Sequence, residues 1–395
     1  MSIILMYALT HFVTQDTYLW EPDWTRRPYI DQLEQFQEEI GLRSPSFDLW
    51  YPNPVYLQRF RGGSPFEARP VPVLSTIGWW DNCAPWSWRD HADIARRPAW
   101  EHNEFLVIES IDHENYPLGW PGGERTQEAL RQMLPAYLDP AVEFFDVFLR
   151  GRGTAAQIPK VRWSLAGTEG FRHAAHWPPS QVERVSWWAT ADGQLSHSDS
   201  GPCTRLSWKH DPNDLVPSSV PDPFSFLQHS PDERDLAQRA DVVGFAGAPV
   251  AEPVNLVGPV RLSLTVESTG PTMDVMARLY DVAPDGRFLR IARGQQTVDD
   301  AGVPVRVDLD LGHVGYQLAA GHHLRLHVQS SDFPEFMPQP GTDESPWSAV
   351  DVAATTQSVI VGGPDGVRLE MGVLPDPGPA CPTVAVGGHR GDDRR

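Results

Sequence analysis

Residues 70–113 alternate between short apolar runs and a helical segment. The runs VPVLSTIG at 71–78 and EFLVIES at 104–110 are almost continuously apolar, which is typical of parallel strands covered on both faces. Between them, WSWRDHADIARR at 86–97 is predicted as a helix that ends before Pro98. We therefore predict one β-α-β unit with parallel strands.

Two further helices are predicted on either side of this unit. In IDQLEQFQEEIG at 30–41, apolar residues recur at helical spacing before a glycine that serves as C-cap. In PAVEFFDVFLRG at 140–151, Asp139 is expected to cap a helix that Pro140 opens. The apolar stripe expected to lie on the sheet consists of Ala141, Val142, Phe145, Phe148 and Leu149.

The pattern changes to period two after Trp177-Pro178-Pro179, which we take as a domain boundary. Apolar residues then alternate with polar ones in several runs, and turn sequences such as PDG at 284–286 and 364–366 separate them. Two predicted strand faces are Val260, Leu262, Leu264 and Val266, and Val305, Val307, Leu309 and Leu311. Many short strands with turns between them predict an all-β sandwich of roughly 200 residues.

The net charge limits the possible binding partners, and the cysteines indicate the redox compartment. The net charge of -20 at pH 7 argues against nucleic acid and against an anionic membrane. Cys83, Cys203 and Cys381 are far apart and lack CxxC spacing, so neither a disulfide framework nor a zinc site is indicated and a reducing cytoplasm fits best. The apolar start of the chain lacks a basic n-region and a cleavage site, and it is too short to span a bilayer.

No cofactor or metal is expected from the sequence. The segment HDPND at 210–214 lacks the spacing of a calcium loop and reads as a self-capping turn. His322 and His323 would point to opposite faces of a strand, which disfavours a shared metal.

Two ionisable residues follow the two strands of the β-α-β unit. Asp81 comes after the first and His113 after the second. Because the carboxyl ends of parallel strands border the functional crevice, we expect these side chains to lie side by side. An acid followed by a histidine is also the order of the last two members of an α/β-hydrolase triad. Trp79 and Trp80 flank the expected crevice and are candidates for binding substrate.

The third triad member, a serine, is not found. A GxSxG elbow does not occur in the sequence, and Ser64 and Ser164 lack the strand-elbow-helix context that such a nucleophile requires. Asp81 and His113 could therefore act as acid and base, but the nucleophile is missing.

The chain resembles the cocaine-esterase and X-Pro dipeptidyl-peptidase family of serine hydrolases. The resemblance rests on GWWD, a histidine about thirty residues later, FFDVFLRG, the WPP boundary, HDPND, RADVVGF, GPVRLSLTVES, MDVMARLYDVAPDGR and GHHLRLHVQSSDFPEF, in the family's order. It implies that Asp81 is the triad acid and His113 the triad histidine. Ser110-Ile111-Asp112 stands where the family usually has a Pro-Trp pair before the histidine. The family's first strands, its oxyanion tyrosine and its serine elbow have no counterpart here.

The resemblance implies an α/β plus all-β fold with three parts. Residues 1–62 are expected to be the remnant of a helical cap, residues 63–180 the incomplete C-terminal part of an α/β-hydrolase domain, and residues 181–395 a jelly-roll sandwich of the galactose-binding-like type. An α/β piece of this size leaves open sheet edges, so residues 63–180 are expected to be loose or aggregation-prone unless another chain supplies the missing strands.

Three functions remain open. In the first, the chain is the C-terminal portion of a hydrolase of small-molecule esters or X-Pro peptides that has lost its serine to truncation and is inactive alone. In the second, it is one half of a split hydrolase, whose complementary N-terminal half brings the serine. In the third, it is a non-catalytic binding or interaction module in which the jelly roll is the functional part.

Overall fold

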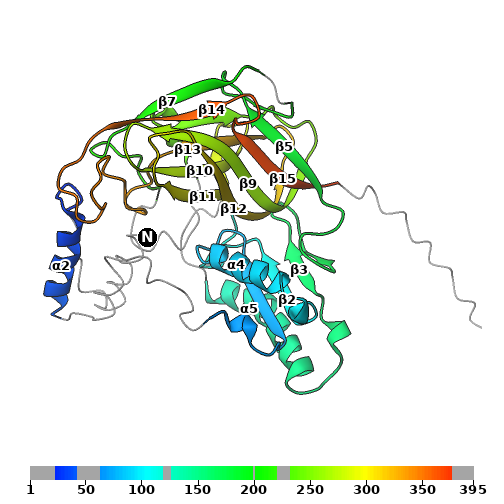
Figure 1. The fold of residues 1–395 in the computed structure, drawn as a ribbon. Helices are drawn as coiled ribbons and strands as arrows, with labels where there is room; N and C mark the ends of the chain where they lie inside the picture. Colours follow the sequence, from blue (N-terminus) through cyan, green and yellow to red (C-terminus); the bar gives the residue numbers. More distant parts are fainter. Residues whose placement is uncertain (1–22, 42–62, 119–125, 199–200, 220–231, 376–395) are drawn as a thin grey trace, which may run out of the picture.

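The computed structural model describes residues 23–41, 63–118, 126–198, 201–219 and 232–375. Within these ranges the strands form three sheets, one of four strands near the N-terminal side and two that make up a β-sandwich. Figure 1 shows the sandwich above and the smaller sheet with its helices below. Strands therefore make up most of the regular secondary structure in the described chain, and helices are few.

The smaller sheet contains the predicted β-α-β unit. Strand β1 (Val73–Gly78) pairs in parallel with β2 (Glu104–Glu109), and helix α4 (Ala84–Ala95) connects them. The helix ends before Pro98, as predicted. Parallel pairing brings the carboxyl ends of β1 and β2 to the same edge of the sheet.

Two further strands, not predicted from the sequence, extend this sheet. Strand β3 (Val161–Ser164) pairs in parallel with β2, and β4 (Phe171–Ala174) pairs antiparallel with β3. The strand order is β1-β2-β3-β4, so β1 lies at one edge. No described strand pairs with the outer side of β1, which leaves its backbone groups available to another strand.

Helix α5 (Gln127–Phe148) starts well before the predicted start at Pro140. Its N-cap is Thr126, whose side chain accepts a hydrogen bond from the backbone N–H of Ala129 at 3.1 Å. Pro135 and Pro140 both lie inside the helix. The predicted start was wrong because proline also occurs inside a helix where the rest of the helix tolerates the loss of one N–H donor.

The predicted stripe of α5 was also wrong in phase. Phe144 is buried, and its ring packs 5.6 Å from that of Phe105 on β2, with Phe148 at 5.3 Å from the same ring. Val142 and Phe145 are instead half exposed. One helical face is open to solvent, and its exposed large apolar residues are Leu134, Tyr137, Leu138, Val142, Phe145 and Leu149.

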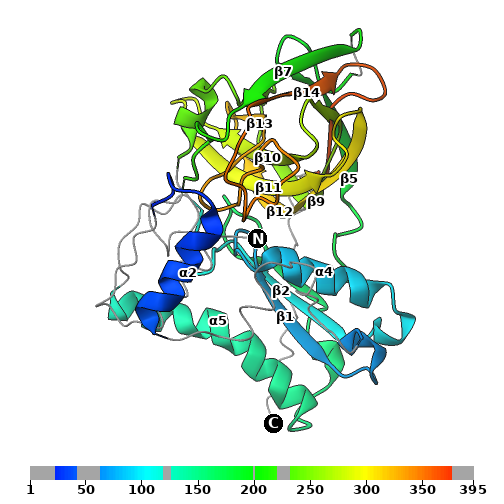
Figure 2. The ribbon, with the colours of Figure 1, turned by 60° about the vertical axis from the view of Figure 1, so that its left-hand side comes forward.

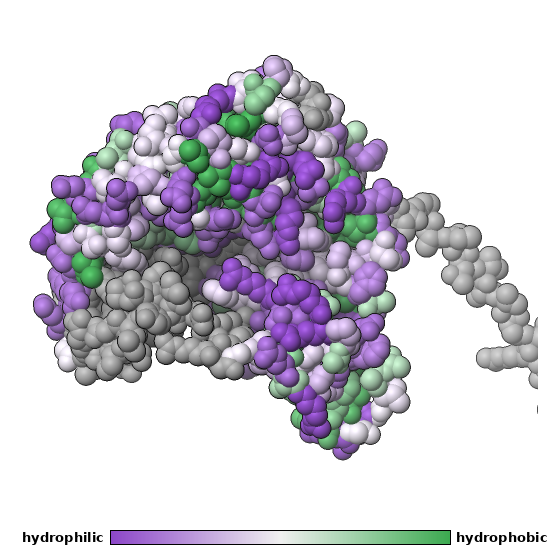
Figure 3. All heavy atoms as spheres, in the orientation of Figure 1, coloured by the Kyte–Doolittle hydropathy of each residue, from purple (hydrophilic) through white to green (hydrophobic). Residues whose placement is uncertain are grey.

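Burial of the two parallel strands differs. The four central residues of β2 are buried, as expected for a strand covered on both faces. Only the last two residues of β1 are buried, so the expectation of full coverage was wrong for this edge strand. The face seen in Figure 3 is mainly hydrophilic, with hydrophobic residues scattered over the sandwich and at the lower end of the molecule.

The sandwich is made of two sheets of antiparallel strands. Within the described residues one sheet has the order β11-β10-β13-β8, and the other has the order β6-β5-β15-β9-β14-β7 with β12 also paired to β9. Its strands are β5 (Glu183–Ala189), β6 (Leu195–Ser196), β7 (Thr204–His210), β8 (Val243–Ala246), β9 (Val254–Ser268), β10 (Met273–Val282), β11 (Phe288–Val298), β12 (Val305–Leu318), β13 (His323–Gln329), β14 (Thr355–Val361) and β15 (Arg368–Leu374). The predicted all-β sandwich is confirmed.

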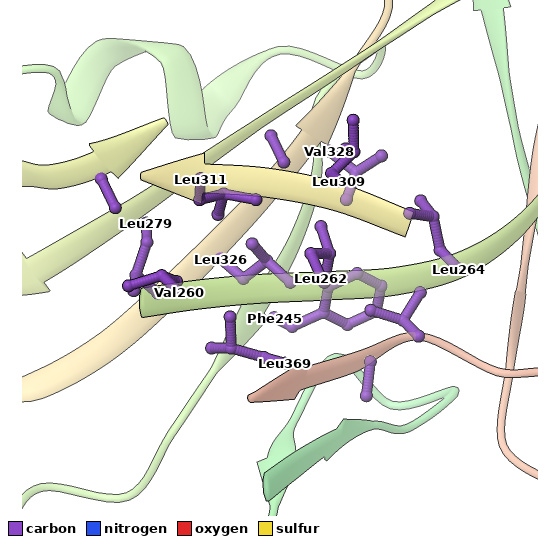
Figure 4. Packing of buried hydrophobic residues seen from close by; sticks show 14 of the residues in the cluster. Phe245, Val260, Leu262, Leu264, Leu279, Leu309, Leu311, Leu326, Val328 and Leu369 are labelled. Atoms are coloured by element: carbon purple, nitrogen blue, oxygen red, sulfur yellow. The ribbon is translucent and has the colours of Figure 1, made fainter. Parts of the chain in front are cut away.

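The core of the sandwich lies between its sheets. Leu262 on β9 and Leu309 on β12 face Leu279 on β10 and Leu326 on β13 in one buried cluster (Figure 4). The predicted alternation is confirmed on β12, where Arg306, Asp308 and Asp310 are exposed between buried apolar neighbours. This large core, and not the small α/β sheet, contains most of the buried apolar residues of the described chain.

The N-terminal helix α2 (Tyr29–Ile40) ends at Gly41 in a left-handed C-cap, as predicted. Its first residue, Tyr29, stacks on Phe333 at 5.5 Å and packs with Met337. Figure 2 shows this end of α2 beside the sandwich. The remaining described helices are the short 3-10 turns η2 (Pro65–Glu67), η3 (Pro98–Trp100), η4 (Ala155–Gln157) and η6 (Arg234–Gln238). Among the described helices, none combines the length and apolar composition needed to cross a bilayer.

Candidate functional site

The turn after β1 is fixed by backbone hydrogen bonds to the loop after β2. Trp79 N–H donates to the carbonyl of Glu109 at 2.9 Å, and Trp80 N–H donates to that of Ile111 at 3.2 Å. Asp81 N–H then turns back to the carbonyl of Gly78 at 3.3 Å. The two connections therefore run side by side beyond the ends of their strands.

The loop that carries His113 is held by its neighbour Asp112. This carboxylate is buried and accepts hydrogen bonds from the backbone N–H groups of Glu114 at 3.0 Å and Tyr116 at 2.9 Å. The backbone N–H of Asp112 in turn donates to the carbonyl of Tyr116 at 2.9 Å. Such an Asx-type turn keeps Asp112 inside and presents His113 on the outer side of the loop.

Asp81 and His113 are hydrogen-bonded to each other. Nδ1 of His113 lies 2.8 Å from Oδ1 of Asp81, with side-chain exposures of 41% and 24%. With its proton on Nδ1, the imidazole donates to the carboxylate and keeps Nε2 as an acceptor for a hydroxyl. That is the orientation that an acid imposes on the base of a hydrolytic triad. The structure thus brings together the two residues singled out in the sequence, and their catalytic roles stay a prediction.

Trp79 and Trp80 contact the sandwich and the core of the α/β sheet. Trp79 is 5% exposed and donates from Nε1 to the carbonyl of Ser164 at 3.0 Å. Trp80 is half-buried and donates from Nε1 to the carbonyl of Ile291 on β11 at 3.1 Å. Both indoles therefore hold the turn of Asp81 against neighbouring elements, and their predicted contact with substrate stays a prediction.

An aromatic cluster between the α/β sheet and the sandwich lies beneath this turn. Trp88 of α4 stacks on His313 of β12 at 4.0 Å, and Trp177 donates from Nε1 to Nδ1 of His313 at 2.9 Å. Burial of His313 lowers its pKa from 6.5 to about 3. The imidazole is therefore neutral at pH 7, which suits an acceptor enclosed by indole rings.

Cys83 is the site residue that sequence reasoning overlooked. It is the N-cap residue of α4, and its backbone N–H donates to Oδ1 of Asp81 at 2.8 Å. Its sulfur and one ligand atom each of Asp81 and His113 lie within 4.8 Å of one another. Cys83 is exposed, but neighbouring atoms partly desolvate its thiol, and this desolvation, with the charge and hydrogen bond of Asp81, raises the pKa of the thiol. The only signal in the sequence was its position two residues after the acid.

The two serines weighed in the sequence are engaged elsewhere. Ser64 donates to Oδ2 of Asp93 at 2.9 Å and accepts from the N–H of Phe66, as the N-cap of η2. The hydroxyl of Ser164 lies 2.7 Å from that of Ser110. Neither environment is the strand-to-helix elbow of a nucleophile.

The segment HDPND forms the self-capping turn that the sequence predicts. Oδ1 of Asp211 accepts a hydrogen bond from the N–H of Asn213 at 3.0 Å, and its other oxygen lies 2.7 Å from Nζ of Lys209. The carboxylate of Asp211 is thus used within the turn.

Comparison with known proteins gives one family match and several relatives. Residues 153–366 match the family described as the X-Pro dipeptidyl-peptidase C-terminal non-catalytic domain. The cocaine esterase of Rhodococcus sp. (strain MB1 Bresler) is 28% identical over 298 residues, which cover 67% of this chain and 50% of the esterase. The chain spans about half the length of the curated relatives it matches.

Solved structures share the fold over a longer stretch. An aminopeptidase from a marine sediment Thaumarchaeota archaeon matches with a TM-score of 0.70 at 19% identity, covering 87% of this chain and 62% of the aminopeptidase. An α-amino acid ester hydrolase matches with a TM-score of 0.70 at 21% identity, covering 89% of this chain and 64% of the hydrolase. At these identities the likeness establishes the fold, and the chemistry has to be argued from the site.

Proposed function

The chain belongs to the family of the X-Pro dipeptidyl-peptidase C-terminal non-catalytic domain, and we propose that it is the C-terminal portion of an acyl hydrolase whose base is His113 and whose acid is Asp81. The observation that carries this proposal is the 2.8 Å hydrogen bond between Nδ1 of His113 and Oδ1 of Asp81. Both residues lie beyond the carboxyl ends of adjacent parallel strands, where α/β enzymes place their active sites.

In this proposal a serine hydroxyl meets Nε2 of His113. The imidazole accepts the hydroxyl proton while the oxygen attacks the acyl carbon, and it later gives that proton to the leaving group. Asp81 keeps the ring in the required tautomer and stabilises the imidazolium. The exposure of His113 leaves room for a second element to approach.

The nucleophile would come from polypeptide outside residues 1–395. The sequence has no GxSxG elbow. The outer edge of β1 and the apolar face of α5 are open within the described residues, and a neighbouring parallel strand and its helices would cover both. We therefore propose an N-terminal half, in the same polypeptide or a separate one, and expect no hydrolysis from these residues alone.

The substrates we propose are small esters or X-Pro peptides. The family description and the relatives carry the names X-Pro dipeptidyl-peptidase, cocaine esterase and α-amino acid ester hydrolase. Trp79 is buried and Trp80 is only half-buried, so Trp80 is the better candidate for lining the acyl pocket.

In this proposal the sandwich holds the turn that carries Asp81 in place. We propose that residues 1–62 derive from a helical cap, that residues 63–180 are the C-terminal part of an α/β-hydrolase domain, and that residues 181–395 form a jelly roll. Residues 1–22, 42–62 and 376–395 of these parts lie outside the described residues. The hydrogen bond from Trp80 to Ile291 ties the Asp81 turn to the sandwich. A cytoplasmic location would keep the exposed thiols of Cys83 and Cys203 reduced.

A second candidate is a non-catalytic binding or interaction module. It is favoured by the family match, which is described as non-catalytic and covers most of the sandwich. The full chain would then bind glycans or peptides on arrays without any second polypeptide. Absence of binding on both arrays would remove this candidate.

The experiment for the main proposal is complementation. The chain is co-expressed with the polypeptide encoded directly upstream of codon 1, and hydrolysis of p-nitrophenyl esters and X-Pro p-nitroanilides is measured. We expect the pair to be active and more of the chain to be soluble, and each partner to be inactive alone. Upstream DNA without a GxSxG sequence in any frame, together with an inactive pair, would refute the proposal.

A further inference from the structure

Three different ligand types meet at the ends of β1 and β2. One carboxylate oxygen of Asp81, the sulfur of Cys83 and one ring nitrogen of His113 all lie within 4.8 Å of one another. Cys83 is exposed, and the side chains of Asp81 and His113 are partly open to solvent. An ion could therefore reach the cluster without any rearrangement of the fold.

The backbone around these ligands is fixed. Asp81 and Cys83 belong to one turn, closed by the Cys83 N–H to Asp81 Oδ1 bond of 2.8 Å and by the Ala84 N–H to Asp81 carbonyl bond of 2.9 Å. His113 comes from the other loop, which the buried Asp112 holds in place. The ligands thus come from two anchored connections, so only side-chain rotations are needed to adjust their distances.

We propose that Asp81, Cys83 and His113 bind a single Zn²⁺ ion. Zinc bonds of about 2.0–2.3 Å in tetrahedral geometry separate neighbouring ligand atoms by roughly 3.3–3.6 Å. The atoms here span from 2.8 Å, between His113 and Asp81, to at most 4.8 Å. Small rotations of three partly exposed side chains bridge that difference. Three protein ligands leave the fourth position to water.

The three ligand atoms, an oxygen, a sulfur and a ring nitrogen, determine which metals can bind. Thiolate and imidazole favour zinc and related transition metals, whereas Mg²⁺ and Ca²⁺ require oxygen ligands. Binding replaces the thiol proton with the metal, and that proton leaves to solvent. We assign the ion to Nδ1 of His113, the ring nitrogen that faces Asp81, so zinc and the Asp81–His113 hydrogen bond exclude each other. Zinc would therefore switch off the base of the proposed hydrolase, although its binding to the chain does not depend on catalysis.

The test is a titration of the full chain with Co²⁺ and Zn²⁺. Co²⁺ reports a thiolate ligand through its charge-transfer absorption, and Zn²⁺ is followed by competition with a chromogenic chelator. We expect one ion per chain, a higher melting temperature with Zn²⁺, and neither effect with Mg²⁺ or Ca²⁺. Cys83→Ser and His113→Ala should each weaken Zn²⁺ binding at least tenfold, and Cys83→Ser should also abolish the charge-transfer band.

Matched controls are Cys203→Ser and His102→Ala, which remove an exposed cysteine and an exposed histidine elsewhere in the described chain. Both should keep the band and the affinity. Metal-free melting temperatures of all variants establish that each is folded. A band that survives Cys83→Ser, or one that Cys203→Ser removes, would overturn the proposal. Failure of complementation would leave these binding results intact and bear only on the hydrolase.

Discussion

The indole of Trp79 lies directly on the backbone of Gly315. A Cβ atom added to this glycine would stand 2.4 Å from Cζ2 of Trp79, well inside van der Waals contact. Gly315 belongs to β12 of the sandwich, and Trp79 is the second residue before Asp81. The contact joins the sandwich to the turn that carries the proposed acid.

The first prediction follows from this close approach. Gly315→Ala should displace Trp79 and lower the free energy of unfolding by about 1–3 kcal/mol, the usual cost of overpacking. Urea unfolding followed by tryptophan fluorescence measures the loss. Gly302→Ala is the matched control, because a Cβ there meets nothing within 4 Å, and its effect should be within about 0.5 kcal/mol. Equal stability of the two variants would show that the contact is unimportant.

The second prediction concerns His313. Its folded pKa of about 3 lies below the ordinary 6.5, so the unfolded chain takes up a proton first as the pH falls. The stability that depends on neutral His313 is therefore complete above pH 6.5 and is lost progressively toward pH 3. When the pH falls from 7 to 5, the titration of this single histidine should lower the free energy of unfolding by about 2 kcal/mol.

His313→Gln removes this titration, so its unfolding free energy should depend less on pH between 7 and 5 than that of the unsubstituted chain. The buried His327 also has a pKa lowered to about 3, and it titrates equally in both proteins. The difference between the two curves of unfolding free energy against pH therefore isolates His313. Parallel curves would mean that His313 titrates normally when folded.

The third prediction separates the two faces of α5. Phe144→Ala should lower the free energy of unfolding by about 3–5 kcal/mol, because Phe144 is buried against Phe105. Phe145→Ser, on the exposed face, should change stability by less than about 1 kcal/mol and reduce aggregation in light scattering. In the complemented enzyme the same Phe145→Ser should weaken assembly. Unchanged aggregation and assembly would argue against a partner on this face.

Local pattern was sufficient for the elements that position the candidate site. The continuous apolar runs around 71–78 and 104–110 identified β1 and β2, and the parallel arrangement then placed Asp81 next to His113. A different pattern, alternation of apolar and polar residues, identified β12 as a sandwich strand, since side chains alternate between the faces of a strand. The strands themselves follow from the pattern of one element at a time, and only the pairing of Asp81 with His113 needs two neighbouring strands.

Features that depend on several elements were not predictable. The phase of α5 depends on which side of the helix meets Phe105, and Asp139-Pro140 imitated a helix start while Thr126 was the actual cap. Cys83 appeared isolated because its proximity to His113 arises only when two loops meet. The Trp79–Gly315 contact joins residues more than two hundred positions apart, and no local pattern encodes it.

The fourth prediction concerns the chain by itself. Treated with a fluorophosphonate probe, the purified chain should not be labelled, because no serine in the sequence has the context of an activated nucleophile. In-gel fluorescence with a heat-denatured control measures this. A labelled serine in the folded chain would mean that His113 serves a nucleophile within residues 1–395.

If His113 and Asp81 are the base and acid of a serine hydrolase that a second polypeptide completes, a fluorophosphonate probe must label the complemented pair. We expect a labelled serine on the partner, with the labelling rate and ester turnover reduced by about 10⁶-fold in His113→Ala and about 10⁴-fold in Asp81→Asn, and unchanged in the His102→Ala control. Labelling and turnover that survive His113→Ala at the unsubstituted rate would contradict this assignment.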